Sequence, residues 1–115
     1  MDEKNERFDP QVLLRLTKGN QAVFAAVVSE FRTQCPSILA DMESSVTAGD
    51  WPQVLFHAHA VKGMFRQLGA TQLQKLTIEM EQLAKENADP AKLAALSDSI
   101  RQEYGELCQL LNSYS

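Results

Sequence analysis

The stretch that decides the fold runs from Asn20 to Gly49 and reads NQAVFAAVVSEFRTQCPSILADMESSVTAG. Its apolar side chains recur at steps of three and four residues, as on the core-facing side of an α-helix. They are Phe24, Val27, Phe31, Cys35, Ile38, Met42 and Val46. Asn20 can cap the helix at its start, and Gly49 can end it in the left-handed conformation. The stretch therefore predicts one long helix, which the interior Pro36 should kink.

The rest of the chain also carries residues that typically begin and end helices. Three further helix starts carry an aspartate with a proline in the first turn: Asp9-Pro10, Asp50-Trp51-Pro52 and Asp89-Pro90. Helix ends are expected at Lys18-Gly19, Leu68-Gly69-Ala70 and Asn87-Ala88. A fourth helix, between the last two of these, carries Leu73, Leu76, Met80 and Leu83, and the fifth extends to Leu111. Since the loops are short, consecutive helices should be antiparallel neighbours.

These patterns predict an all-α fold. We expect an antiparallel up-down four-helix bundle with a short additional N-terminal helix laid across one end. With 115 residues the chain is long enough for one core, so residues 1–115 should form a single domain, with a flexible N-terminus over residues 1–8.

Composition and charge exclude several classes of function. The formal net charge of −4 and the lack of a basic block argue against nucleic acid as a partner. The longest apolar run, residues 22–28, is far shorter than the ~20 residues of a membrane span, and the charged N-terminus is unlike a signal peptide. Cys35 and Cys108 occupy apolar positions, as small buried hydrophobic residues do in a reducing compartment. We therefore expect a cytoplasmic protein without membrane contact.

The third helix carries a stripe of unusual composition. His59, Lys62, Gly63 and Arg66 are spaced at i, i+3, i+4 and i+7, which places them on one face of a helix. His57 lies about 160° away around the axis, on the flank or core side. Because the two imidazoles diverge, they cannot share a metal ion, and we expect no metal site.

The surroundings of His59 suggest a docking surface. A glycine inside a helix costs up to ~1 kcal/mol relative to alanine, and Gly63 lies one turn from His59 on the same face. A residue without a side chain gives a partner room to approach closely. Leu55 and Phe56 are apolar but fall near His59 on the outward side, with no evident role in the core. Met64 and Phe65, by contrast, should face the bundle.

This stripe fits a carrier of phosphoryl groups. A neutral imidazole offers a nucleophilic lone pair, and Lys62 with Arg66 could offset the charge of an attached phosphoryl group. The chain has no glycine-rich phosphate loop and no cluster of acidic metal ligands. We therefore expect it to bind no cofactor, and a partner to supply the Mg²⁺ and the groups that stabilise the transition state.

The run Ala58-His59-Ala60-Val61-Lys62-Gly63, followed by Leu68-Gly69-Ala70, resembles the signature of histidine-containing phosphotransfer (HPt) domains of bacterial phosphorelays. Phe31, Pro36, Leu39 and Gly49-Asp50-Trp51 are also similar to landmarks of that family. The resemblance implies a monomeric four-helix bundle whose partners are receiver domains of response regulators and hybrid sensor kinases. It implies that His59 accepts the phosphoryl group, that Lys62 is the cation beside the phosphate, and that Gly63 gives clearance for the receiver.

The chain departs from the family pattern at two places. Val61 replaces the usual leucine, and Met64-Phe65-Arg66 stands where small residues commonly follow the lysine and glycine. We interpret Arg66 as a second cation near the phosphate.

Two other classes of function are compatible with an all-α chain of this size. One is a helical adaptor that binds receivers or kinases without transferring phosphate, which the retention of His59, Lys62 and Gly63 disfavours. The other is a histidine kinase, which would need nucleotide-binding motifs that this sequence lacks. The sequence therefore favours a phosphocarrier without kinase or phosphatase activity of its own.

Overall fold

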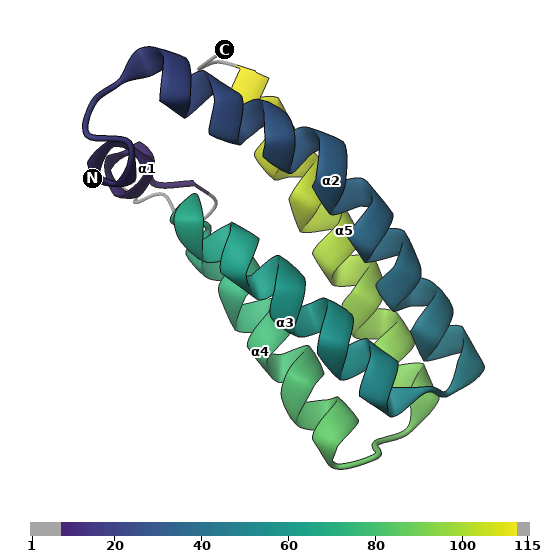
Figure 1. The fold of residues 1–115 in the computed structure, drawn as a ribbon. Coiled ribbons are helices and arrows are strands. Elements are labelled where there is room, and N and C mark those ends of the chain that lie inside the picture. The colour runs from purple at the N-terminus through teal and green to yellow at the C-terminus, as the bar shows by residue number, and fades with distance from the viewer. Residues whose placement is uncertain (1–7, 113–115) are drawn as a thin grey trace.

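The computed structural model describes residues 8–112, and this part of the chain contains five helices and no strand (Figure 1). The helices are α1 (Pro10–Leu16), α2 (Gln21–Ala48), α3 (Trp51–Gln67), α4 (Thr71–Lys85) and α5 (Pro90–Asn112). The all-α prediction is confirmed, and each helix falls where the sequence pattern placed it. None of the helices over residues 8–112 combines the length and the apolar character that a membrane span requires.

The helix ends follow from local chemistry. The Asn20 side chain accepts a hydrogen bond from the backbone N–H of Val23 at 3.1 Å, which satisfies a donor that the first turn leaves free. At the other end of α2, Gly49 has φ +71° in the left-handed region that favours glycine. The helix is continuous over 28 residues, Pro36 included.

The four long helices form a closed ring. In chain order each packs against the next, and α5 packs against α2. Consecutive helices run in opposite directions, so α3 and α4 form one face of the bundle and α2 and α5 form the opposite face (Figure 1). The fully buried core draws on all four: Cys35, Val54, Val61, Phe65, Leu73, Met80, Leu93, Ile100 and Leu107.

The first helix covers the turn between α3 and α4. The backbone N–H of Asp9 donates to the carbonyl oxygen of Leu68 at 3.1 Å. Gly69 in that turn has φ +65°, and a Cβ added there would lie 2.7 Å from the Cβ of Asp9. Only glycine fits this close approach. Phe8, the last residue of the N-terminal segment that was expected to be flexible, is buried in the core. Residues 1–7 lie outside the described residues, so the flexibility of that segment stays a prediction.

Candidate functional site

The imidazole of His59 projects from the middle of α3, and 78% of its side-chain surface is exposed. His57 is half-buried, with its ring 5.3 Å from that of Phe56 between centroids. The two histidines therefore occupy different environments, as the helical angles predict. His59 is the one that a partner protein can reach.

A residue that the sequence pattern did not single out lies beside His59. Glu81, on α4, has its Oε2 3.5 Å from Nδ1 of His59 and its Oε1 2.8 Å from Nζ of Lys62. The Glu81 side chain is only 13% exposed. It escaped the sequence reasoning because it belongs to another helix, 19 positions after Lys62. The only available signal was an acid next to the apolar stripe of α4, which many surface residues share.

The environment of Lys62 differs from the expectation. The stripe predicted an outward cation, but the Lys62 side chain is only 19% exposed and its ammonium pairs with the Glu81 carboxylate. The two charges offset each other, so this pair adds no net charge next to His59. Arg66, one turn further along α3, is exposed and forms an ion pair with none of the described residues. The net positive charge on the stripe therefore comes from Arg66.

Gly63 leaves open space on the same face. A Cβ built at this position would meet no atom within 4 Å. The glycine is therefore not required by packing within the chain, although it weakens the helix. The space above it is available to a docking partner.

The two apolar residues before His59 behave differently. Phe56 is 66% exposed, as expected for a docking surface. Leu55 is half-buried and packs against the core, so the expectation that it lacks a role in the core was wrong. On α4, Ile78 lies one turn before Glu81 and is 52% exposed. Because α3 and α4 are antiparallel, Phe56 and Ile78 flank His59 from opposite ends.

The residues after Gly63 turn toward the core. Phe65 is fully buried, and its ring packs edge-on against that of Phe31 with 6.0 Å between centroids. Met64 is half-buried against the same core. These bulky residues are accommodated within the bundle, as the helical angles predict, and do not obstruct the face that carries His59.

The arrangement suits transfer to and from a partner. An exposed imidazole lies next to one carboxylate, with a free guanidinium one turn beyond Lys62 and an open glycine beside it. Over residues 8–112, no group of three His, Cys, Asp or Glu side chains comes together in a way that could hold a metal ion. An exposed imidazole in its neutral form can act as a nucleophile toward a group that another molecule brings to it.

Comparisons with known proteins agree with this geometry. The family model described as "Hpt domain" matches residues 26–112. The fold is similar to the crystal structure of histidine-containing phosphotransfer protein B (HptB) from Pseudomonas aeruginosa PAO1, with a TM-score of 0.86 and 21% identity over 96% of this chain and 95% of that one. No curated protein matches the sequence. Because the family model spans most of the chain, the protein belongs to the Hpt domain family of histidine phosphotransfer proteins, the intermediates of phosphorelays.

Proposed function

We propose that His59 accepts a phosphoryl group from the aspartyl phosphate of one receiver domain and passes it to the aspartate of another. The observation that carries the proposal is the position of His59. Its imidazole is 78% exposed, at the centre of a face that has open space at Gly63. His57 on the same helix is half-buried, and a helical period places it about 160° from His59 around the axis.

Glu81 favours one ring nitrogen of His59 for the reaction. Its Oε2 lies 3.5 Å from Nδ1, so a proton on Nδ1 faces a carboxylate and Nε2 keeps the lone pair. The Nε2 lone pair forms the N–P bond while the P–O bond to the receiver aspartate breaks, and the electron pair of that bond returns to the carboxylate. Transfer to the second receiver reverses these changes. The ring proton stays on Nδ1 throughout.

The receiver would dock over the α3–α4 face. Its backbone can approach at Gly63, and its apolar residues can cover Phe56 and Ile78, which are both more than half exposed. Arg66 can pair with the phosphoryl group during transfer. We expect the Mg²⁺ to be bound by the receiver, and we propose receivers of response regulators and hybrid sensor kinases as partners of the monomeric chain. The cytoplasmic location expected from the sequence stays a prediction.

Hpt domains are phosphocarriers. We propose that this chain likewise has neither kinase nor phosphatase activity, because its sequence supplies no nucleotide-binding motif. Incubation with radiolabelled ATP and Mg²⁺ alone should leave it unlabelled. Label appearing under these conditions would contradict this part of the proposal.

The decisive experiment mixes the protein with a phosphorylated receiver domain and Mg²⁺. We expect acid-labile, base-stable label on the wild-type chain, as phosphohistidine gives, and no label on the His59→Gln variant. His57→Gln is the matched control, since it changes the neighbouring histidine on the same helix, and it should be labelled like the wild type. Equal labelling of His59→Gln and wild type would refute the assignment. Receiver binding without any label would favour the adaptor function instead.

A further inference from the structure

The two faces of the bundle differ in charge. The helices α2 and α5 together carry three basic and six acidic residues, which gives a formal net charge of −3. The helices α3 and α4 carry four basic and two acidic residues, which gives a formal net charge of +2. The whole chain has a net charge of −4. The face that presents His59 is therefore basic although the protein is acidic (Figure 1).

Within α3 and α4, no exposed carboxylate lies next to His59. The sequence of α3 contains no Asp or Glu. In α4 the Glu81 side chain is only 13% exposed and its carboxylate pairs with the ammonium of Lys62. Glu79 is the other acidic residue of α4, and a helical period places it about 160° from Glu81 around the axis. It lines a pocket together with Lys92 of α5, so it faces away from His59.

Two unpaired cations lie on either side of His59. Arg66 is one of them, and Lys85, in the last turn of α4, is the other. The Lys85 side chain is exposed and forms an ion pair with none of the described residues. It follows Glu81 by one turn on the same side of α4. Because Glu81 lies beside His59 and the two helices are antiparallel, Lys85 lies toward the Phe56 end of the face and Arg66 toward the other end.

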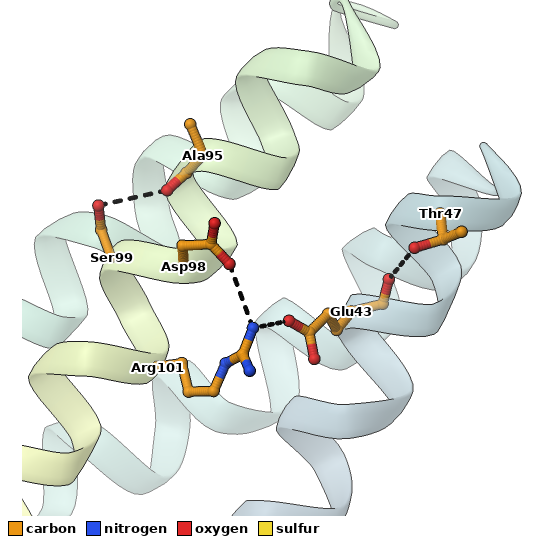
Figure 2. Close-up of polar contacts among 6 residues, drawn as sticks. All are labelled: Glu43, Thr47, Ala95, Asp98, Ser99 and Arg101. Atoms are coloured by element: carbon orange, nitrogen blue, oxygen red, sulfur yellow. Dashed lines mark hydrogen bonds and ion pairs between the residues drawn. The ribbon is translucent and has the colours of Figure 1, made fainter.

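A basic residue of the opposite face has a different environment. Figure 2 shows the guanidinium of Arg101 on α5 reaching across to the carboxylate of Glu43 on α2. A second carboxylate, that of Asp98, lies 3.1 Å from the same guanidinium. The charge of Arg101 is therefore offset within the chain, whereas the charges of Arg66 and Lys85 are available to attract a partner.

We propose that the α3–α4 face recognises its receiver through an acidic docking surface, and that Lys85 pairs with a carboxylate of that surface. The inference rests on the function proposed above, which makes the partner a receiver, and it adds the chemistry by which the receiver is recognised. Arg66 attracts the phosphoryl group at the other end of the face. These attractions speed association, and the acidic α2–α5 face repels the same surface, so the receiver arrives facing His59.

The test measures association separately from phosphoryl transfer. The phosphorylated receiver of the transfer experiment is mixed in a stopped-flow instrument with the His59→Gln chain, which can bind but cannot accept the phosphoryl group. The Debye length shortens from about 30 Å at an ionic strength of about 0.01 M to about 8 Å at about 0.15 M. Over this range we expect the association rate constant to fall roughly tenfold.

Charge variants in the same background locate the attraction. Lys85→Glu should lower the association rate constant roughly fivefold or more at low ionic strength, and Lys85→Gln roughly twofold. Lys85→Arg keeps the charge and should restore the original rate. Lys92→Glu is the matched control, because it changes the net charge as Lys85→Glu does but at an exposed lysine of α5. It should associate as fast as the parent chain.

Two results would overturn the inference. One is an association rate constant that does not fall as the ionic strength rises. The other is an equal loss of rate in Lys85→Glu and Lys92→Glu, which would show that only the net charge matters. Labelling of the wild-type chain distinguishes this failure from that of the proposed function. Label on His59 together with either result refutes the acidic docking surface alone, whereas salt-dependent association without label refutes the transfer. The absence of any association refutes both.

Discussion

The ammonium of Lys62 lies 2.8 Å from Oε1 of Glu81, and both side chains are more than 80% buried between α3 and α4. The pair joins the helix that carries His59 to its neighbour. The second oxygen of the same carboxylate faces His59 at 3.5 Å. A structural contact between two helices and the orientation of the exposed imidazole therefore depend on one side chain.

Removing one partner of this pair should destabilise the protein. In Glu81→Leu the Lys62 ammonium stays mostly buried without its carboxylate, and we expect the free energy of unfolding to fall by about 1–3 kcal/mol. Lys62→Met should lower the free energy of unfolding by a similar amount, because it leaves the Glu81 carboxylate mostly buried without its ammonium partner. Urea unfolding of both variants measures these losses.

The double variant Lys62→Met/Glu81→Leu is the control for that prediction. It replaces both charges by apolar groups, so its loss should be smaller than the sum of the two single losses by about 1 kcal/mol or more. Strictly additive losses would show that the two side chains do not interact in solution.

Gly63→Ala should stabilise the protein but slow the transfer of the phosphoryl group from a receiver. Apart from its own helix backbone, the added methyl group would have none of the described residues within 4 Å, so the helix should gain up to about 1 kcal/mol. The same methyl group occupies the space proposed for the receiver, so transfer from a phosphorylated receiver should slow roughly tenfold or more. Urea unfolding and single-turnover transfer measure the two effects.

Gly105 provides the matched control for Gly63. It also lies within a helix, and a Cβ there would meet nothing within 4 Å, but it lies on α5 away from His59. Gly105→Ala should therefore gain similar stability without slowing transfer. Equal transfer rates for Gly63→Ala and Gly105→Ala would argue against docking at Gly63.

Phe56→Ala should weaken receiver binding without disturbing the fold. The Phe56 side chain is 66% exposed and contributes little to the core. We expect the Kd for the receiver to rise roughly tenfold and the Tm to stay unchanged, since aromatic residues contribute much of the free energy of many interfaces. Leu16→Ala removes an apolar side chain of similar exposure, 59%, from α1 and should leave the Kd unchanged. The same Kd for both variants would place the receiver elsewhere.

The protein should lose stability in alkaline solution. Burial, and secondarily the neighbouring Cys108, raises the pKa of the Cys35 thiol from 9.0 to about 12. Between those two pH values the unfolded chain releases a proton that the native state retains. The free energy of unfolding should therefore fall as the pH rises from 9.0 to about 12, by up to about 1.4 kcal/mol per pH unit. Burial also raises the pKa of the Tyr104 hydroxyl, which adds to the same trend.

Cys35→Ala tests the origin of this alkaline decline. The variant should be less stable at pH 7 because it leaves a cavity in the core. Its stability should nevertheless fall less steeply above pH 9 than that of the wild type. Urea unfolding at several pH values gives the slopes, and parallel slopes would assign the decline to other groups.

The sequence by itself determined the helices and the direction in which His59 points. Asn20 and Gly49 delimit α2 through hydrogen bonds and backbone angles that involve only their own neighbours. The spacing of His59, Gly63 and Arg66 places them on one outward stripe for the same reason, since a helical period relates residues a few positions apart. The burial of Phe65 followed from the same angular positions around the helix axis.

Only the tertiary structure decided which residues of neighbouring helices contact the residues of α3. It put Glu81 beside His59 and Lys62, which made Lys62 a mostly buried partner rather than a free cation, and it turned Leu55 toward the core. It also brought Glu43 of α2 next to Arg101 of α5, where the two side chains form an ion pair (Figure 2). Such contacts depend on the axial offset and rotation of two packed helices. Those are set by how side chains of the whole core interdigitate, which no short stretch of sequence encodes.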